Sequence, residues 1–258
     1  MPWNAKPYNG YALGTQEANE NVLMLNGFMN EYGFTLESQA GLIACIANEG
    51  GLNPWRWGGD YAGYEAMTGD PYNSAQGYGL FQFTPWGKYV DNADAEVLEG
   101  YGPNKSVHEV TEGANINDGW AQMLFYNNRP QDWDANCWRW YWSPENEWVR
   151  EQGFEPLSYE EYAYYHDYVW AGMMERWSDG TDLISKARFK EITYIEDAVM
   201  AFLGGYEGPI VPRYYDYAVS LARGDYIWGL ISSDTPPDPP SGGVRRKKMP
   251  LWMYLRRY

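Results

Sequence analysis

The chain has 258 residues, a formal net charge of -16 and an aromatic content of 18%, with 14 Trp and 24 Tyr. Residues 244–258 carry six Lys and Arg and no acid, which leaves 13 basic against 35 acidic residues in the rest. So acidic a body argues against nucleic acid as a partner, because phosphate binding requires clustered cations. The aromatic excess suits stacking on sugar rings or a protein interface, although a tyrosine-rich surface without a ligand also explains it.

The first residues and the few Cys and His argue against further classes. MPWNAKPYNGYALG has no basic region followed by an apolar run, so we expect no signal peptide. No stretch approaches the roughly 20 apolar residues of a membrane anchor. His108 and His166 are isolated, and we expect neither a metal nor a cofactor. Cys45 is expected to pack in an apolar stretch, with a disulfide to Cys137 as the alternative.

Two helices are predicted at the start of the chain. In residues 15–33, apolar side chains recur at spacings of three and four, with Thr15 as the N-cap and Gly33 as the left-handed end. A second helix follows over residues 35–51, capped by Thr35 and ending at two glycines. Its last residue before those glycines is Glu49.

The pattern then changes, because residues 52–76 alternate short aromatic runs with Gly, Asp, Asn and Pro. We interpret this stretch as a small β-region or a structured loop. Four further helices are predicted, over residues 116–128, 158–180, 194–209 and 213–226. In the second of these, Ser158 is the cap and Glu161 completes a capping box. The third is expected to end at Gly-Gly. Residues 128–157 are Trp-rich and irregular, and the Pro/Gly-rich residues 232–243 indicate an extended linker. The fold class is therefore α+β and mainly helical.

Glu49 has an unusual position for a helix-terminal glutamate. Leu42, Cys45 and Ile46 share its helical face, so its carboxyl group lies on the apolar side. Burial and the negative end of the helix dipole both disfavour the anion, so an elevated pKa is expected. A carboxylic acid that stays protonated near neutral pH is what glycoside cleavage requires. The alternative is a terminal glutamate that turns back to solvent.

The residues around Glu49 carry a resemblance to a known family. The stretch AGLIACIANEGGLNPW, followed by GYGLFQFTPW and later by AFLGGYEGPIVPRYYDYAVSLA, resembles the phage tail lysozymes, which are related to goose-type lysozymes and lytic transglycosylases. These matches span about residues 15–228. Glu49 stands at the family's catalytic position and Asn53-Pro54 at the pair behind it. The chain departs from the pattern at Gly50, where serine is usual, and at Gly208, where arginine is usual.

The resemblance implies a lysozyme-like fold in which a small β-region forms one wall of the cleft. It implies cleavage of the β-1,4 bond between N-acetylmuramic acid and N-acetylglucosamine (MurNAc and GlcNAc) in bacterial peptidoglycan. Glycosidases usually pair the acid with a second carboxylate. Asp60 and Asp70 (with Glu65) are the candidates in the expected β-region, although turn formation explains them equally well. Related enzymes manage with one glutamate, so Glu49 is the only firm assignment.

Substrate contacts are expected from the second and third motifs. Gln82 can hydrogen-bond an N-acetyl group, while aromatic rings can stack on sugar faces. Packing within the β-region is the alternative for the second motif, and locking of a helix end is the alternative for the third. The candidate substrate-binding residues are Tyr78, Gln82, Phe83, Thr84, Trp86, Tyr206 and Glu207.

Three functions remain open. The first is a muralytic enzyme in the virion tail, made in the host cytoplasm, that opens the wall for genome entry. It would comprise a lysozyme-like catalytic domain (residues 1–231), the linker 232–243 and a tail 244–258 that docks on other tail or tail-knob proteins. The second is a catalytically inactive tail protein on the same scaffold that binds wall glycan or is structural. The third is a free endolysin, although no wall-binding domain follows residue 228. For the tail, membrane-surface attachment or disorder is the alternative.

Overall fold

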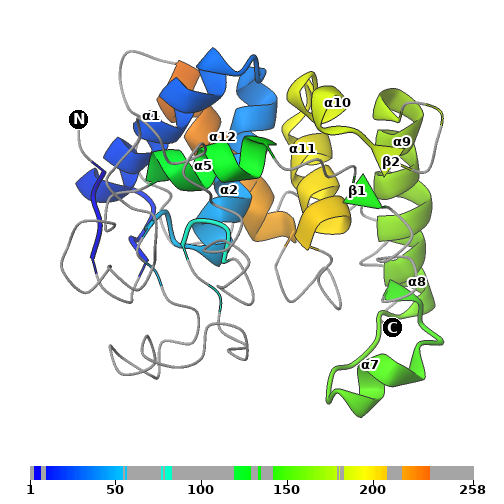
Figure 1. The fold of residues 1–258 in the computed structure, drawn as a ribbon. Coiled ribbons are helices and arrows are strands. Elements are labelled where there is room, and N and C mark those ends of the chain that lie inside the picture. The colour runs from blue at the N-terminus through cyan, green and yellow to red at the C-terminus, as the bar shows by residue number, and fades with distance from the viewer. Residues whose placement is uncertain are drawn as a thin grey trace.

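The protein is mainly helical over the part of the chain that its computed structural model describes (Figure 1). The described residues are 3–6, 10–54, 56, 77, 79–82, 119–128, 133–134, 142–178, 180, 183–207 and 217–232. The predicted β-region (from residue 57 to 76), Cys137, the predicted linker beyond Ser232 and the basic tail lie outside them.

The first two predicted helices and their caps are confirmed. Helix α1 spans Gln16–Glu31, and the Thr15 side chain accepts a hydrogen bond from the backbone N–H of Ala18. Helix α2 spans Leu36–Glu49, with Thr35 accepting in the same way from Ser38. Between them, Gly33 adopts the left-handed conformation with φ +77°. Each helix therefore begins where a hydroxyl can satisfy an otherwise unpaired N–H group.

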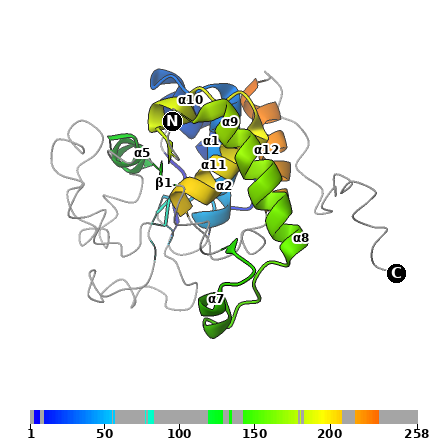
Figure 2. The ribbon, with the colours of Figure 1, turned by 90° about the vertical axis from the view of Figure 1, so that its right-hand side faces the viewer.

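Helix α2 runs through the middle of the described helices and is buried without interruption from residue 38 to 46 (Figure 2). It packs most extensively against α12 (Tyr217–Ser232) and α11 (Ile195–Ala201). A Cβ atom on Gly41 would lie 2.5 Å from the Cβ of Ala198, and one on Gly224 would lie 2.6 Å from Ile195 Cγ2. These glycines let the three backbones approach closely enough to close the core.

Helix α5 spans Gly119–Asn128, as predicted, and is followed by the two-residue strand β1 (Trp133–Asp134). Helix α7 (Glu147–Glu151) lies in the stretch that was expected to be irregular. A long rod then comprises α8 (Tyr159–Tyr162), the π-helix η3 (Ala163–Trp170) and α9 (Ala171–Trp177), with α7 beside its free end (Figure 1).

The rod has the predicted start. Ser158 and Glu161 form the complete capping box, in which each side chain bonds the other residue's backbone N–H. The prediction of one continuous helix holds, although its middle is wound as a π-helix. That middle, AYYHDYVW, is dominated by aromatic and β-branched residues, which favour the α conformation less than alanine or leucine.

The last part of the described chain corrects two helix boundaries. Strand β2 (Leu183–Ile184) pairs antiparallel with β1, and α10 (Lys186–Lys190) follows it. The prediction that the next helix ends at Gly-Gly is wrong, because α11 continues as the π-helix η4 (Phe202–Glu207) through both glycines. A Cβ on Gly204 would lie 2.4 Å from the Trp170 ring, so this glycine provides room for a side chain from the rod. Helix α12 extends past its predicted end at 226 to Ser232.

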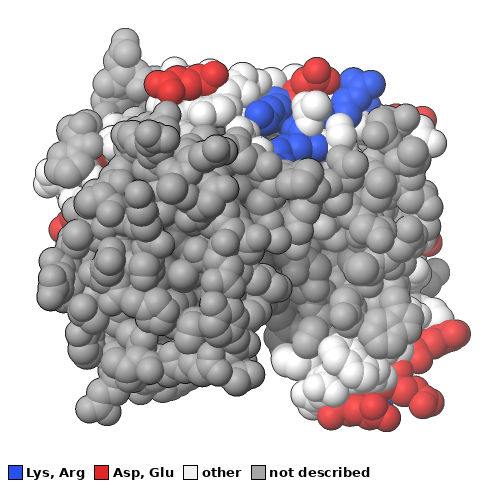
Figure 3. All heavy atoms as spheres, viewed as in Figure 1, with Lys and Arg blue, Asp and Glu red and all other residues white. Residues whose placement is uncertain are grey.

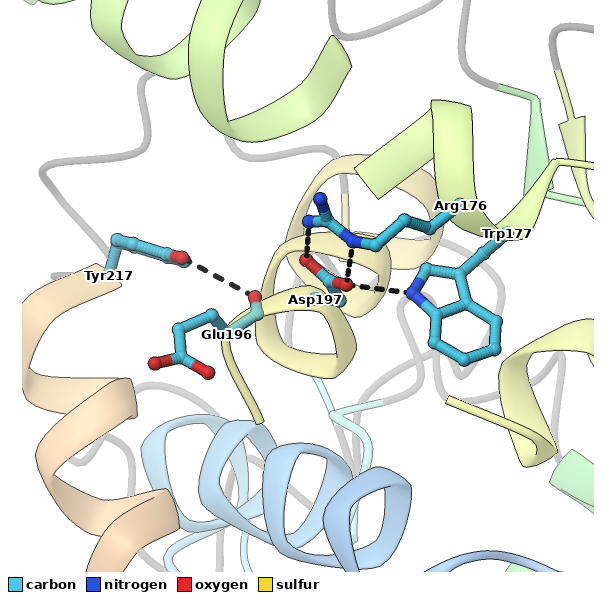
Figure 4. A network of polar contacts seen from close by, with 5 residues as sticks. All are labelled: Arg176, Trp177, Glu196, Asp197 and Tyr217. Atoms are coloured by element: carbon cyan, nitrogen blue, oxygen red, sulfur yellow. Dashed lines mark hydrogen bonds and ion pairs between the residues drawn. The ribbon is translucent and has the colours of Figure 1, made fainter. Parts of the chain in front are cut away.

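An ion pair between a buried aspartate and a half-exposed arginine joins the rod to the central helices (Figure 4). Asp197 of α11 is 2% exposed and accepts two hydrogen bonds from Arg176, at 2.8 and 2.6 Å. Trp177 donates a third from its indole N–H at 2.7 Å. On the other side of α11, the hydroxyl of Tyr217 donates to the carbonyl oxygen of Glu196, and burial raises the pKa of this tyrosine well above its ordinary value. The network satisfies a carboxylate that would otherwise be costly to bury.

The described surface carries its charges unevenly. Acidic side chains gather over α7 (Figure 3), and the exposed ones on α7 and around the start of α8 are Glu145, Glu147, Glu151, Glu155 and Glu160. Basic residues lie on α10 at the opposite end of this face (Figure 3). None of the described helices is both long enough and apolar enough to cross a membrane.

Candidate active site

Glu49 is the last residue of α2 and is half-buried. Gly50 caps the helix, donating its N–H to the carbonyl oxygen of Ile46 at 2.8 Å. The chain then reverses through two left-handed residues, Gly51 (φ +54°) and Leu52 (φ +56°). A leucine rarely adopts this conformation, so the loop must be held in place by its surroundings.

The environment of Glu49 makes it a weak acid. Burial raises the pKa of its carboxyl group to about 7, while the positive charge of the Arg56 guanidinium acts in the opposite direction. The elevated pKa expected from the sequence is confirmed in direction, but the sequence analysis overlooked Arg56. A group with this pKa is substantially protonated at neutral pH and can donate its proton.

Arg56 lies close to the turn behind Glu49. Its Nη1 atom is 3.2 Å from the position that a Cβ on Gly51 would occupy. Among the described residues, its buried Nε atom has no hydrogen-bond partner. The carbonyl oxygen of Arg56 accepts from the N–H of Gly79 at 2.8 Å, so its backbone also bonds the second motif.

The second motif forms a turn over residues 79–82 that lies directly against Gly50. A Cβ on Gly50 would be 2.5 Å from the carbonyl oxygen of Leu80 and 2.7 Å from that of Gly79. The φ of Gly50 is -92°, so glycine is required here by lack of space and not by backbone conformation. The departure from serine at this position therefore has a packing reason: the two motifs touch through their backbones.

Two buried asparagines hold the loop behind Glu49. Asn53 donates to the carbonyl oxygen of Lys6 at 2.7 Å and accepts from the N–H of the same residue. Asn21 of α1 donates to the carbonyl oxygens of Leu52 and Asn4, both at 2.8 Å. The left-handed Leu52 is thus fixed from one side by α1 and the loop is fixed from the other by the N-terminal segment.

A buried glutamine on α5 connects the two motifs. The Oε1 atom of Gln122 accepts from the N–H of Leu80 at 2.8 Å, and its Nε2 donates to the carbonyl oxygen of Pro54 at 2.8 Å. A Cβ on Gly79 would be 2.2 Å from Oε1, and the φ of Gly79 is +78°. Sequence analysis missed Gln122; its only signal was a lone polar residue between apolar ones in the helix.

Aromatic rings from three elements meet beside the second-motif turn. Phe81 stacks on Tyr126 of α5 with ring centroids 4.5 Å apart, and Tyr206 of η4 meets Tyr126 edge-on at 5.3 Å. Phe202 stacks on Tyr206 at 4.7 Å. The structure thus brings the predicted site residue Tyr206 to the second motif, half-buried at the edge of this cluster.

Asn48, immediately before Glu49, is bonded to α12. Its Nδ2 donates to the hydroxyl of Ser220, and its Oδ1 accepts from Arg223. Ser220 and Arg223 are three residues apart and so lie on one face of α12. This pair fixes the last turn of α2 from the side of the core, a role that the sequence did not indicate.

Gln82 has a left-handed backbone with φ +46°. Its side-chain amide donates to the carbonyl oxygens of Gly79 at 2.8 Å and Arg56 at 3.4 Å. The amide therefore braces the turn; its expected contact with an N-acetyl group stays a prediction. Of Glu207, only the backbone, at the end of η4, belongs to the described part of the chain. The other predicted site residues lie outside it, namely Asp60, Asp70, Tyr78, Phe83, Thr84 and Trp86.

Comparison with known proteins is consistent with this arrangement. The chain matches one family model, described as phage tail lysozyme, over residues 20–226. That range includes Glu49, the second-motif turn, α5 and most of α12. No curated protein matches the chain.

Proposed function

The chain belongs to the phage tail lysozyme family, whose members are peptidoglycan-hydrolysing tail proteins, and from this premise we propose that Glu49 is its general acid. The bond cleaved is the β-1,4 linkage from MurNAc to GlcNAc. The single observation that carries the assignment is the half-buried carboxyl group at the end of α2, with a pKa of about 7, one residue before the backbone junction of two family motifs at Gly50. Asp60 and Asp70 are the proposed candidates for a second carboxylate.

In the first step, the protonated Glu49 donates to the glycosidic oxygen as the bond between that oxygen and the anomeric carbon breaks. GlcNAc leaves with a hydroxyl group, and positive charge develops on the muramoyl ring. Ionisation of Glu49 then places a carboxylate beside that charge. The Arg56 guanidinium limits how far burial raises the pKa, so the proton is available near neutral pH.

In the second step, the Glu49 carboxylate takes a proton from the group that attacks the anomeric carbon. If the attacking group is water, the product has a reducing muramic acid end. If it is the 6-hydroxyl of the same sugar, the product is a 1,6-anhydro sugar. Both routes return the proton to Glu49, so one carboxyl group is sufficient.

Binding of the glycan is assigned to the second and third motifs. Gln82 lies in the turn that contacts Gly50, and Tyr206 lies in the aromatic cluster beside that turn, which supports their assignment to substrate contact. The face of an aromatic ring can stack on a sugar ring, and amide groups can bond an N-acetyl substituent. The proposed contacts from outside the described residues are Tyr78, Phe83, Thr84, Trp86 and Glu207.

We propose that the enzyme acts from the virion tail and opens the wall for genome entry. Residues 244–258 dock it on acidic surfaces of other tail proteins, because six cations flank apolar residues suited to a groove. Deletion of residues 240–258 should remove the protein from particles but leave hydrolysis in solution unchanged. Immunoblotting of purified particles measures the first effect. Particles that retain the truncated chain would refute the docking role.

The product spectrum of digested peptidoglycan tests the proposed function. Mass spectrometry should reveal disaccharide muropeptides that end either in reducing or in 1,6-anhydro muramic acid, which also decides between hydrolase and transglycosylase. The competing function is a glycan-binding protein without catalysis, for which no new product forms. Gly50 does not favour that alternative, because its departure from serine follows from the close backbone contact with Gly79 and Leu80.

A further inference from the structure

Gln122 occupies an unusual place for a glutamine. It is fully buried in α5, yet both ends of its amide are used by segments far away in the sequence. The carbonyl end serves Leu80, 42 residues away, and the amino end serves Pro54, 68 residues away. Both partners are backbone groups that the fold buries, so no water replaces the amide at either one.

The two segments that Gln122 joins are the ones that flank Glu49. Pro54 belongs to the loop that leaves α2 after Glu49, and Leu80 belongs to the turn whose carbonyl oxygens lie against Gly50. No side chain separates the loop from the turn at Gly50. Their separation is therefore fixed by the direct bond from the N–H of Gly79 to the carbonyl oxygen of Arg56 and by groups that bond both segments. Gln122, from a third element, bonds each segment with good geometry.

We propose that Gln122 is a positioning residue for the reaction: by bonding Pro54 and Leu80 together, it sets where the second-motif turn lies relative to Glu49. The inference rests on the proposed function of Glu49. Gln122 does not touch the substrate, and it acts through the turn that it holds.

The neighbouring residues agree with this role. Tyr126, one helical turn further along α5, stacks on Phe81, so the same face of α5 holds two consecutive residues of the turn. Gly79 has no space for a Cβ because Oε1 of Gln122 would be 2.2 Å away. The amide and the turn are thus fitted to each other in shape as well as in hydrogen bonding.

A substitution of Gln122 should move the turn away from Gly50. Methionine has nearly the same length but leaves the N–H of Leu80 and the carbonyl oxygen of Pro54 unbonded. We expect water to enter and hydrogen-bond these two backbone groups, which would place water beside Glu49. Displacement of a catalytic constellation by about 1 Å costs on the order of 10²-fold in rate. Hydration of Glu49 also reduces the effect of burial on its pKa.

The experiment compares Gln122→Met with Gln39→Met. Gln39 is an equally buried glutamine near the other end of α2, where it bonds Asn26, Asn30 and the carbonyl oxygen of Phe34. Its replacement removes a similar set of buried hydrogen bonds at a distance from Glu49. Rates are measured on purified peptidoglycan per folded molecule, below the melting temperature of both variants. We expect kcat to fall on the order of 10²-fold for Gln122→Met, with KM changed less than about threefold, and no such fall for Gln39→Met.

A third variant guards against simple misfolding of Gln122→Met. In Gln122→Glu, a protonated carboxyl can still donate to Pro54 and accept from Leu80, whereas the ionised form can only accept and leaves the carbonyl oxygen of Pro54 unbonded. The ratio of its rate to that of the wild type should therefore rise as the pH falls. An equal loss of rate in Gln122→Met and Gln39→Met, or a ratio for Gln122→Glu that does not change with pH, would overturn the proposal.

A second readout keeps this inference separate from the proposed function. The pKa of the Glu49 carboxyl group, measured by carbon NMR, should be lower in Gln122→Met than in the wild type and unchanged in Gln39→Met. If Glu49→Gln retained full activity, the proposed function would fail, and Gln122 would have no catalytic acid to position. If Glu49→Gln is inactive but Gln122→Met keeps both the wild-type rate and the wild-type pKa of Glu49, the proposed function stands and the role of Gln122 is refuted.

Discussion

The two halves of the central helix α2 are held in different ways. From residue 38 to 46, α2 is surrounded by α11 and α12, and apolar packing closes the contact at Gly41 and Gly224. Around Glu49, the loop after α2 and the turn over residues 79–82 contact each other through their backbones at Gly50. They are fixed by the side-chain amides of Asn21, Asn53 and Gln122. Apart from the buried hydrogen bonds of Gln39 and Asp197, the body of the protein is thus stabilised by the exclusion of water from apolar surface, whereas the candidate site is held by individual hydrogen bonds.

This difference has a consequence for function. Apolar packing is non-directional and tolerates small shifts, whereas a hydrogen bond fixes distance and angle. A site that must hold a carboxyl group within a fraction of an ångström gains from the second kind of support. Substitutions in the body should therefore reduce stability with little effect on the rate per folded molecule, whereas substitutions near Glu49 should also reduce that rate.

Among substitutions that leave Glu49 in place, the largest effect is expected for Gly50→Ala. Its Cβ would meet backbone carbonyl oxygens of Leu80 and Gly79 that cannot rotate away, so the second-motif turn must move. We expect a loss of activity on the order of 10²-fold, with a stability cost of about 1–3 kcal/mol. The control is Gly27→Ala in α1, where nothing lies within 4 Å of the new Cβ and a gain of about 0.5–1 kcal/mol is expected. Initial rates measure the activity of both variants, and urea denaturation measures their stability. Wild-type activity in Gly50→Ala would show that the backbone contact at Gly50 is not needed for catalysis.

A smaller effect, confined to stability, is expected for Asp197→Ala in the body. The variant removes three hydrogen bonds from the network in Figure 4 but leaves Arg176 half-exposed, so the remaining charge can be solvated. We expect a loss of about 2 kcal/mol, below the range for a fully buried pair. Glu191→Ala, which breaks the exposed pair with Arg188, should cost less than about 0.5 kcal/mol. A fall in rate per folded molecule in Asp197→Ala would contradict the separation of body and site.

The smallest effect is expected for Arg56→Gln, as a shift of the pH profile. The active form of Glu49 is protonated, so activity falls as the pH rises through its pKa of about 7. The guanidinium lowers that pKa, and its removal should raise it, which moves the alkaline limb of kcat/KM to higher pH by about one unit or less. Arg188→Gln, on α10, should leave the profile unchanged. A shift to lower pH in Arg56→Gln would contradict the electrostatic role given to this residue.

The same contrast explains what the sequence could predict. Thr15, Thr35 and Ser158 were identified as caps because a cap depends on neighbours along the chain. The end of α11 was misplaced because Gly204 serves a ring from a distant helix and not a helix terminus.

At the candidate site, helical periodicity was sufficient to place Glu49 at the end of α2 and to predict its raised pKa, while its catalytic role stays a prediction. The sequence did not indicate Gln122 and Asn21, because their bonds join residues 17 to 68 positions apart and a local pattern does not record such pairs. The sequence did not indicate Arg56, because its effect on the pKa of Glu49 depends on the distance between the two side chains in space.

The most direct test of the central claim is the activity of Glu49→Gln on purified peptidoglycan, followed by mass spectrometry of the released muropeptides. Glutamine keeps the shape of the side chain but has no acidic proton to transfer, so the rate should fall 10²–10⁴-fold, the usual contribution of a general acid. Folding raises the pKa of Glu49, so the wild-type protein loses stability as the pH rises through that pKa and the buried carboxyl group ionises. Glutamine does not ionise, so the variant should be at least as stable as the wild type at pH 8. A folded Glu49→Gln protein that retains more than about a tenth of the wild-type rate would contradict the assignment of Glu49 as the general acid.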